Sequence, residues 1–330
     1  MSWRGKRVLV TGANGFIGSH LAERLAREGA RVRAFVRYSS SNSWGLLDQC
    51  PKELRDAMEV VPGDIRDGDG VSQAVRGCEV VLHLAALISV PYSLQAPDSF
   101  VDTNVRGTLN VLQAARLHGG VKVVQTSTSE VYGTPETVPI TEAHTLRAQS
   151  PYAASKIAAE KLAESFFHSY DLPVVILRPF NTYGPRQSTR AVFPVILSQL
   201  LAGRDEVHLG ALSPRRDLTY VDDTVDGFLR AGEASEAVGR TVHLGTGRDI
   251  SIGELAELAA KVLGKQVSVI SEEERRRPPH SEVARLVSDP SLASELLGWS
   301  AATSLEEGIA RTAAWMEGRM DEYRVGQYVT

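Results

Sequence analysis

Cysteine, long apolar runs and an excess of basic charge are scarce or missing in this 330-residue sequence. Two cysteines, Cys50 and Cys78, are too few for a disulfide framework and lie in no CxxC spacing, so we expect a reducing compartment such as the cytoplasm and no bound metal. No apolar run approaches the roughly 18 residues of a membrane-spanning helix, and Met1–Arg7 shows no leader pattern for export. With 36 Lys and Arg against 40 Asp and Glu, a nucleic-acid partner is not expected either.

Short apolar runs instead alternate with amphipathic stretches of helical length through the first 180 residues. Runs of this kind are typical of strands covered by helices on both faces, and the stretches between them place apolar residues at i, i+3 and i+4. The rhythm predicts an α/β fold with a Rossmann-type doubly wound parallel sheet of six strands. We expect strands at Arg7–Thr11, Arg31–Arg37, Met58–Val61, Glu79–Leu84, Lys122–Thr126 and Pro173–Arg178, and helices over Ser19–Glu28, Gly107–Leu117 and Ala153–Phe167.

After Pro179 the alternation is less regular, which predicts a smaller C-terminal α/β lobe. We divide the chain into a dinucleotide-binding domain over residues 1–180 and a substrate-binding lobe over residues 181–330, with Phe180–Arg190 as a polar loop. The boundary is approximate, because Thr241–Leu244 resembles a strand that returns to the main sheet. Further helices are expected near Val192–Leu201, Val221–Ala234, Ile252–Val262 and Leu305–Met316.

A glycine-rich turn, TGANGFIG, follows the first expected strand and opens the first expected helix. Its glycines permit a tight turn and close approach of the backbone to a pyrophosphate, and the helix start offers N–H groups to the anion. A lone glycine pattern is weak, since structural turns also produce it, but this strand–turn–helix context favours dinucleotide binding. The predicted cofactor contacts here are Gly12, Asn14, Gly15, Phe16, Ile17 and Gly18.

The end of the second strand bears on the choice between NAD and NADP. An NAD site usually places a carboxylate there, whereas this chain has Arg37 and Ser39, which suit a 2′-phosphate. Arg37 is equally explained as a solvated charge, so both cofactors stay open, with a slight preference for NADP. His83 is interpreted as either a cofactor neighbour or a core histidine. Other predicted cofactor contacts are Asp64, Ile65, Leu84, Ala85 and Ala86.

Tyr152 and Lys156 form a YxxxK spacing that puts both side chains on one helix face. A cation there would lower the pKa of the tyrosine and make it a base near neutral pH. The pair alone means little, because the spacing is common by chance. However, the segment STSEVYG (127–133) follows the fifth expected strand, at the edge where ligands bind in open α/β sheets.

Motifs along nearly the whole chain resemble the extended short-chain dehydrogenase/reductases that act on nucleotide sugars. The resemblance rests on TGANGFIGSHL, HLAA, STSEVYG, SPYAASK, RPFNTYGPRQ and RRDLTYVDD. The glutamate at position 130 makes the chain similar to the 4,6-dehydratases, which carry glutamate at this position, whereas 4-epimerases commonly have alanine or serine. Thr128-Ser129-Glu130 is similar to GDP-mannose 4,6-dehydratase, and phrases such as AFVRYSSSNSWG and AQSPYAASK are similar to the N-acetylhexosamine-nucleotide 4,6-dehydratases of legionaminic-acid synthesis, which are usually described as NAD-dependent.

The resemblance implies a lyase, a nucleotide-sugar 4,6-dehydratase that forms a 4-keto-6-deoxy sugar and regenerates a tightly bound NAD or NADP in each cycle. Tyr152 with Lys156 would take the O4 proton, Thr128 would donate to O4, and Glu130 would take the C5 proton. Ser129 stands where the usual acid is found, so either Glu130 also protonates the leaving hydroxyl or Ser129 relays a proton.

The resemblance also implies a nucleotide-diphosphate-sugar substrate and a homodimer formed through two helices, about Asp98–His118 and Pro151–Tyr170. Asn181 and Arg216 match family positions that face the diphosphate. Arginines suit phosphate oxygens, so Arg190 and Arg277 are further candidates, with solvated surface charges as the alternative. Ser89 is a candidate sugar contact or a turn cap.

Three alternatives to the dehydratase remain. A 4-epimerase shares the fold and the Tyr-Lys pair, and a UDP-glucuronate decarboxylase also carries STSEVYG, although such enzymes tend to have arginine where this chain has Gln149. A non-catalytic dinucleotide-sensing protein would keep the fold, but the presence of Thr128, Tyr152 and Lys156 opposes it.

Overall fold

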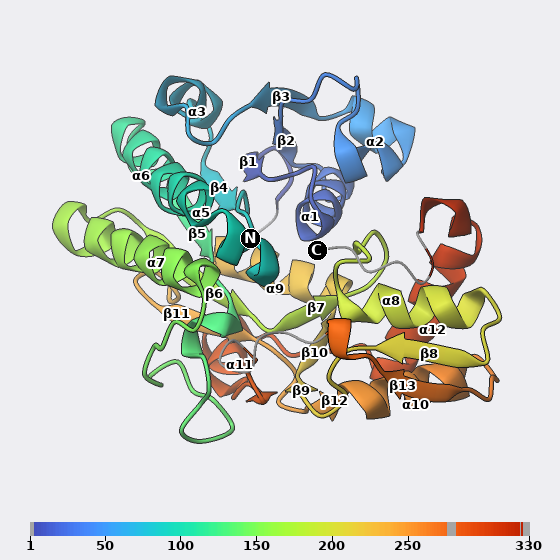
Figure 1. Cartoon of the computed structure of the whole chain (residues 1–330). Helices are drawn as coiled ribbons and strands as arrows, with labels where there is room; N and C mark the ends of the chain where they lie inside the picture. Colours follow the sequence, from blue (N-terminus) through green and yellow to red (C-terminus); the bar gives the residue numbers. More distant parts are fainter. Residues whose placement is uncertain (1–2, 276–281, 324, 326–330) are drawn as a thin grey trace.

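A seven-stranded parallel sheet forms the centre of the computed structural model, which describes residues 3–275, 282–323 and 325 (Figure 1). The strand order is β11-β6-β5-β4-β1-β2-β3, so β1 lies where the order reverses, as in a doubly wound sheet. The predicted fold class is therefore confirmed, but the sheet has seven strands and not the predicted six. The strands are β1 (Arg7–Thr11), β2 (Arg31–Arg37), β3 (Glu59–Gly63), β4 (Val80–His83), β5 (Lys122–Thr126), β6 (Val174–Pro179) and β11 (Thr241–Leu244).

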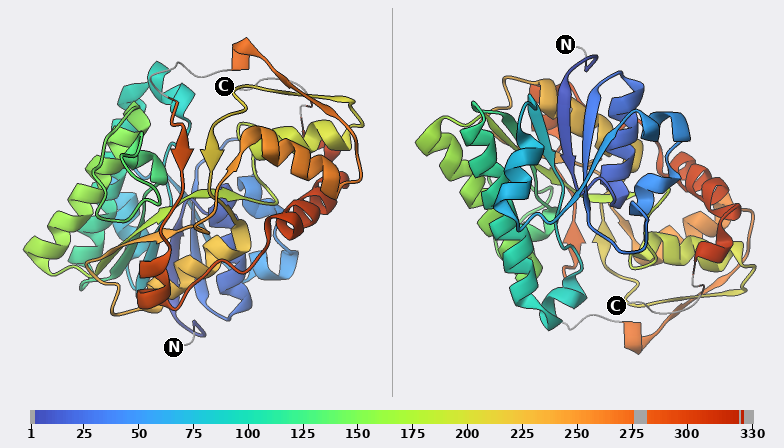
Figure 2. Two further views of the ribbon diagram at one scale, coloured as in Figure 1. Left: turned by 90° about the horizontal axis from the view of Figure 1, so that it is seen from below. Right: turned by 90° about the horizontal axis from the view of Figure 1, so that it is seen from above.

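Helices cover both faces of this sheet (Figures 1 and 2). Successive side chains of a strand point to opposite faces, and in β1 Val8 and Val10 lie in one apolar cluster while Leu9 lies in the other. Both faces are buried, which explains the continuous apolar runs. The first face is covered by α1 (Phe16–Arg27) and α9 (Val221–Glu233), and the second by α3 (Gly68–Val75), α6 (Gly107–Leu117) and α7 (Pro151–Tyr170).

Two segments after residue 180 belong to the main sheet. Strand β11 pairs in parallel with β6, as the strand-like pattern of 241–244 predicted, and supplies the seventh strand. Helix α9 packs against β4, β5 and β6. The division into residues 1–180 and 181–330 thus stays a prediction. It follows the order of the chain, but parts of the second segment pack with the first.

The remaining C-terminal residues form a smaller α/β region of short sheets and helices. The segment predicted as a polar loop after Pro179 begins instead with β7 (Asn181–Tyr183), which pairs with β10 (Leu218–Tyr220). The loop prediction was wrong for Asn181–Tyr183. These three residues are too few and too polar to show a strand pattern, and they form a strand only by pairing with β10. The other elements are α8 (Val192–Leu201), β8 (Glu206–Leu209), β9 (Arg215–Arg216), β12 (Ile250–Ser251), α10 (Ile252–Val262), β13 (Ser268–Ser271), β14 (Arg285–Leu286), α11 (Ser291–Leu297) and α12 (Leu305–Glu317).

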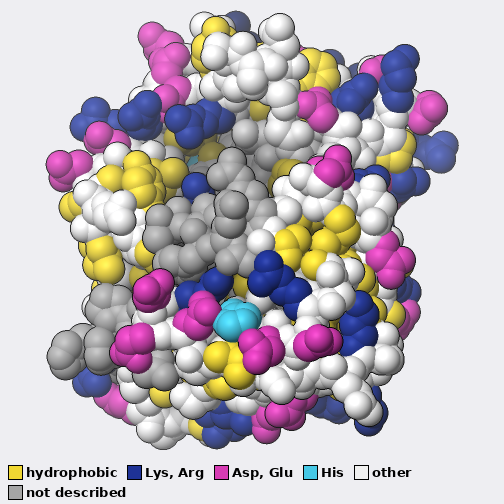
Figure 3. All heavy atoms as spheres, turned by 45° about the vertical axis from the view of Figure 1, so that its right-hand side comes forward, with side chains coloured by type: hydrophobic (Ala, Val, Ile, Leu, Met, Phe, Trp, Pro, Cys, Tyr) yellow, Lys and Arg dark blue, Asp and Glu magenta, His cyan; other side chains and the backbone are white. Residues whose placement is uncertain are grey.

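Short helical segments connect these elements. They are η1 (Gly45–Gln49), α2 (Lys52–Asp56), α4 (Val90–Gln95), α5 (Pro97–Phe100), the π-helical η2 (Val101–Arg106), η3 (Ser129–Tyr132), η4 (Glu273–Arg275) and η6 (Met320–Glu322). Within the described ranges, none of the helices has the length and apolar character needed to cross a membrane. Acidic and basic side chains are interspersed on the face shown in Figure 3, in keeping with the nearly balanced charge.

Candidate active site

The glycine-rich turn packs directly against the end of β4. Gly12 has a φ of +71°, and a Cβ there would lie 2.8 Å from the Ala85 amide nitrogen. A Cβ on Gly18 would lie 2.2 Å from the Gly12 carbonyl oxygen. Both positions therefore require glycine. Gly15 is the N-cap of α1 and provides no side-chain cap, so the N–H groups of Phe16 and Ile17 point toward the start of the helix without intrahelical partners.

Thr11, which the sequence analysis missed, fixes this turn to the neighbouring strand. Its Oγ1 accepts hydrogen bonds from the Leu84 and Ala85 amides, each at 3.1 Å, and lies 2.7 Å from His83 Nδ1. The other ring nitrogen of His83 lies 3.2 Å from Thr108 Oγ1, and burial lowers the pKa of His83 to about 3. His83 is therefore a neutral core histidine. The sequence feature that could have identified Thr11 is its hydroxyl at the last position of the first strand, directly before Gly12.

The predicted cofactor contacts Arg37, Ser39, Asp64 and Ile65 lie at or just after the ends of β2 and β3. Arg37 and Ser39 are exposed, and Ser39 Oγ forms a hydrogen bond with Ser41 Oγ. The Arg66 guanidinium donates three hydrogen bonds to the Asp64 carboxylate, at 3.0, 3.1 and 2.6 Å, and holds the pKa of that carboxyl below its usual range. Ile65 is buried against Gly107.

The residues present fit a bound dinucleotide. Gly12 and Gly18 allow close backbone approach, and the start of α1 offers N–H groups to a diphosphate. At the end of β5, Thr126 Oγ1 and Ser127 Oγ are buried and have no hydrogen-bond partner among the described residues. Unpaired buried hydroxyls are costly, so this edge is built to receive a polar ligand.

Helix α7 positions Tyr152 and Lys156 one turn apart at the carboxyl edge of the sheet. The helix starts there because the Ser150 side chain accepts a hydrogen bond from the Ala153 amide and Pro151 occupies the first turn. Both functional side chains are buried, and Lys156 Nζ donates to the Thr126 carbonyl at 2.6 Å.

The electrostatics of this pair differ from the sequence prediction. Burial raises the pKa of Tyr152 to about 12, against a lowering hydrogen bond from Thr128, and the charge of Glu130 raises it further. Burial also lowers the pKa of Lys156 to about 8, with the charge of Glu160 opposing. The prediction that Lys156 lowers the tyrosine pKa was wrong, because desolvation dominates and the ammonium is bonded to a carbonyl.

The short helix η3 brings the next three predicted catalytic residues beside Tyr152. Thr128 is its N-cap, and Thr128 Oγ1 accepts a hydrogen bond from the Glu130 amide at 3.2 Å. Thr128 and Glu130 are partly exposed, whereas Ser129 is 3% exposed. The Thr128 hydroxyl bonds to the Tyr152 phenol and lowers its pKa, whereas Glu130 acts on the phenol through its charge alone, which raises the pKa.

Asn104 in η2, also missed by the sequence analysis, supports this arrangement. Its Nδ2 donates to Ser155 Oγ at 2.9 Å and to the Leu87 carbonyl at 3.0 Å, and its Oδ1 accepts from the Leu87 amide at 2.8 Å. Ser155 Oγ donates in turn to the Tyr152 carbonyl. The amide thereby joins the first turn of α7 to the loop after β4. The expected helix over 98–118 is interrupted by the π-helical η2, and this interruption places Asn104 where it can make these bonds. The spacing of apolar residues does not show the interruption, so no pattern in the sequence indicates Asn104.

The predicted substrate residues are distributed unevenly. Asn181 begins β7, and its Oδ1 is buried without a hydrogen-bond partner among the described residues. Buried Arg216 is paired with Glu282 at 2.9 Å and donates to the Val283 carbonyl at 2.7 Å. Ser89 accepts from the Tyr92 amide and caps α4, which is the turn-cap alternative. Arg190 is exposed, and Arg277 lies outside the described residues.

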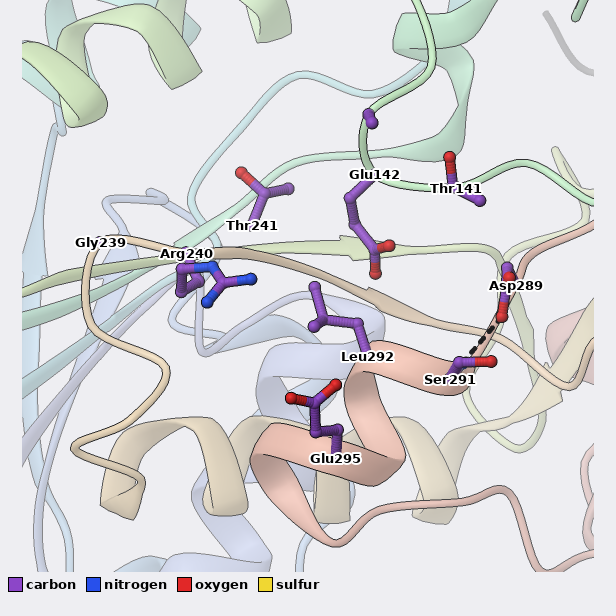
Figure 4. A pocket seen from close by; sticks show the side chains of 10 residues that line it. Thr141, Glu142, Gly239, Arg240, Thr241, Asp289, Ser291, Leu292 and Glu295 are labelled. Carbon is purple, nitrogen blue, oxygen red and sulfur yellow. Dashed lines mark hydrogen bonds between the residues drawn. The ribbon is translucent and has the colours of Figure 1, made fainter.

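Buried Asp217 next to Arg216 was not predicted. Its carboxylate accepts five hydrogen bonds, from the backbone and hydroxyl of Thr246, the Gly247 amide, and the backbone and hydroxyl of Ser288. These bonds fix the strand that carries Arg216 relative to β11 and β14. A cavity of about 440 Å³ between Thr141–Ala143, Gly239–Thr241 and α11 contains none of the predicted site residues (Figure 4). In the described part of the chain, no cluster of three or more His, Cys, Asp or Glu suits a metal ion.

Comparison with known proteins gives a consistent group of relatives. A family model described as GDP-mannose 4,6 dehydratase matches residues 9–312. The chain is 38% identical over 319 residues to a UDP-glucose 4-epimerase of Mycolicibacterium smegmatis, covering 95% of this chain and 99% of that protein. It is 34% identical over 312 residues to a dTDP-glucose 4,6-dehydratase of Streptomyces griseus, covering 93% of each.

A solved structure of UDP-glucuronic acid 4-epimerase from Bacillus cereus, in complex with UDP-glucuronic acid and NAD, matches with a TM-score of 0.86 and 28% identity. The match covers 94% of this chain and 99% of that chain. None of these three relatives is named as a legionaminic-type dehydratase, so that finer resemblance stays a prediction.

The close approach at Gly12 predicts a specific loss of dinucleotide binding. Gly12→Ala should weaken binding about tenfold or more, a cost of about 1.4 kcal/mol per factor of ten, because the added methyl collides with the Ala85 backbone. Gly120→Ala is the matched control, since its φ is +75° but nothing lies within 4 Å of the added atom. Isothermal titration should separate the two variants; equal affinities would contradict the packing argument.

Burial of neutral His83 predicts a loss of stability in acid. Its pKa is about 3 in the folded chain against an ordinary value of 6.5 for histidine, so between these values the unfolded state binds the extra proton. Stability therefore falls as the pH falls from 6.5 toward 3, by at most about 1.4 kcal/mol per pH unit from this residue. Urea unfolding of His83→Gln between pH 6 and 4 should show a shallower decline than the exposed-site control His168→Gln; parallel declines would count against the assignment.

Proposed function

Because the chain belongs to the extended short-chain dehydrogenase/reductase family of NAD-dependent nucleotide-sugar epimerases and dehydratases, we propose that this enzyme is a nucleotide-sugar 4,6-dehydratase. The observation that carries the proposal is the packing of η3, which carries Glu130 two residues after its N-cap Thr128, against α7, which carries Tyr152. Epimerisation at C4 needs an acid–base group at O4 only. Elimination of water needs a second base at C5, and Glu130 is the carboxylate that η3 offers for this step.

Tyr152, Thr128 and Glu130 divide the proton transfers between them. Tyr152 takes the O4 proton, and the hydrogen bond from Thr128 lowers the pKa of the phenol against the larger, raising effect of burial. Glu130 takes the C5 proton, which the new C4 carbonyl acidifies. A bound dinucleotide supplies a hydride acceptor for C4 and a hydride donor for C6, so the balance is the loss of one water. The residues proposed to hold it are those of the glycine turn and of the ends of β2 to β5.

Glu130 is also the better candidate for protonating the leaving hydroxyl at C6. Ser129 stands where the family usually has the acid, but it is 3% exposed, whereas Glu130 is partly exposed. We therefore assign both proton transfers, at C5 and at the leaving oxygen, to Glu130. Once Glu130 has accepted the C5 proton, it is protonated and can donate that proton to the leaving hydroxyl at C6.

The second candidate is a 4-epimerase, favoured by the 38% identity to a protein of that name. It uses the same Tyr152 and Lys156 but returns the hydride to C4. Incubation with UDP-, GDP-, dTDP- and CDP-hexoses, followed by mass spectrometry, distinguishes the two. A dehydratase gives a product lighter by one water from at least one donor, and an epimerase gives a product of unchanged mass.

For the cofactor we propose NAD. The Bacillus cereus epimerase binds NAD in its solved structure, and Arg37 lies near the Asp64 carboxylate, whose pKa it helps to lower. The preference for NADP rested on Arg37 and Ser39 and on the absence of a carboxylate at the end of the second strand, and NADP remains the alternative. Tighter binding of NAD than of NADP in a titration of the wild-type protein would support this choice.

We also propose that the enzyme is a homodimer that contacts its copy through η2–α6 and α7. Large apolar side chains on these helices are exposed, with Val101 at 55%, Leu117 at 72% and Tyr170 at 50%. Light scattering should give twice the chain mass of 35.8 kDa, and the monomer mass would contradict the proposal. Location in the cytoplasm stays a prediction.

The role of Glu130 predicts a clean separation of binding from elimination. Glu130→Gln should bind the dinucleotide and the donor like the wild type but lose 4-keto-6-deoxy product by about 10²-fold or more, the size of a general acid–base contribution. Glu136→Gln, at an exposed position six residues later, is the control. Undiminished product from Glu130→Gln would remove Glu130 from its role.

A further inference from the structure

A buried ion pair lies behind the proposed catalytic residues. Arg178, on β6, donates through Nε and Nη2 to the two carboxylate oxygens of Glu160, at 2.8 and 2.7 Å. The side chains are 3% and 0% exposed. Glu160 lies on α7, one turn beyond Lys156, so the pair fixes β6 to the helix that carries Tyr152 and Lys156.

The remaining nitrogen of Arg178 reaches the turn that carries Glu130. Nη1 donates to Tyr132 Oη at 2.5 Å and to the Glu142 carbonyl at 3.3 Å. Tyr132 is the last residue of η3, two positions after Glu130, and is fully buried. A single guanidinium therefore contacts both α7 and η3.

The hydrogen bonds at Tyr132 have one consistent direction. Because Arg178 donates to the phenol oxygen, the phenol proton is available for His243 Nε2, at 2.5 Å. This requires a neutral imidazole, and burial lowers the pKa of His243 to about 3. Burial raises the pKa of Tyr132, which keeps its proton in place. The chain of donors thus runs from Arg178 through Tyr132 to His243.

Ring contacts and a further carboxylate fix the far end of this chain. The Tyr132 ring meets His144 and His243 edge-on, with centroids 5.8 and 5.5 Å apart. Glu142 accepts a hydrogen bond from the His243 backbone amide at 2.9 Å, and in Figure 4 its side chain extends into the cavity beside β11. His243 Nδ1 has no hydrogen-bond partner among the described residues, but the Tyr132 hydroxyl is bonded on both sides, and a buried polar group bonded in this way is held in one geometry.

We propose that Tyr132 is a positioning residue for Glu130, and that its hydroxyl, held between Arg178 and His243, fixes the end of η3 and thereby holds Glu130 in place relative to α7, the helix that carries Tyr152. The inference rests on the proposed function. Thr128 fixes the start of η3 through the Glu130 amide, and Tyr132 fixes its end. Tyr132 itself does not contact substrate; it acts through Glu130.

The test separates the step that needs Glu130 from the step that does not. In a single turnover in D₂O, C4 oxidation is followed by the absorbance of reduced nicotinamide, and deuterium incorporation at C5 reports proton removal by Glu130. Tyr132→Phe should slow C5 exchange on the order of 10- to 100-fold, the effect of a displacement of about 1 Å, while C4 oxidation stays within about twofold because Tyr152 and Lys156 remain in place. Tyr183→Phe, which removes the hydroxyl of an equally buried tyrosine packed against α12, should leave both steps as in the wild type.

Each outcome decides. Unchanged C5 exchange in Tyr132→Phe overturns the inference, and so does an equal slowing of both steps together with a lower melting temperature, which a purely structural role would give. If Tyr132→Phe does not fold, His243→Leu removes the acceptor of the phenol proton, and the same split between the two steps is expected. Wild-type enzyme that forms no dehydrated product from any donor overturns the proposed function instead, and does so before any variant is compared.

Discussion

The carboxyl ends of β1, β4, β5 and β6 meet at one edge of a single parallel sheet, and every group of the candidate site is held relative to that edge. Strand β1 delivers the Gly12 turn, β5 delivers η3 with Glu130, and α7 begins at the same edge with Tyr152. Right-handed crossovers leave few other ways to connect such strands. Residues from distant parts of the chain therefore meet at one edge of the sheet.

Burial at this edge determines the chemistry of its titratable groups. It raises the pKa of Tyr152 to about 12 and lowers that of Lys156 to about 8. The buried charges of Arg178 and Glu160 are paired with each other. Arg178 of this ion pair also bonds to Tyr132 on η3. The pair therefore connects α7, which carries Tyr152, with η3, which carries Glu130.

The sequence predicted best what depends on local pattern. Strands β1, β2 and β5 and helices α6, α8 and α10 have the predicted bounds, because period-2 or period-3.6 runs of apolar residues identify them. Features that depend on distant partners were missed. Strand β7 is defined only by β10, and the hydrogen bond from Tyr132 to His243 joins residues 111 positions apart. The spacing of Tyr152 and Lys156 was correct, but spacing does not reveal burial, and burial reversed the expected pKa shift of the tyrosine.

The central claim is that Tyr152 and Glu130 act on one hexose. A crystal structure of the Tyr152→Phe protein with NAD and the donor that the wild type consumes measures this most directly, since removal of the phenol oxygen is expected to stop turnover while the substrate still binds. The account predicts the Glu130 carboxylate about 3–3.5 Å from the sugar C5, the separation of a reactive conformer, with Thr128 Oγ1 at O4. A carboxylate turned away from the sugar, with only residue 152 and Thr128 near O4, would contradict the account and favour the 4-epimerase.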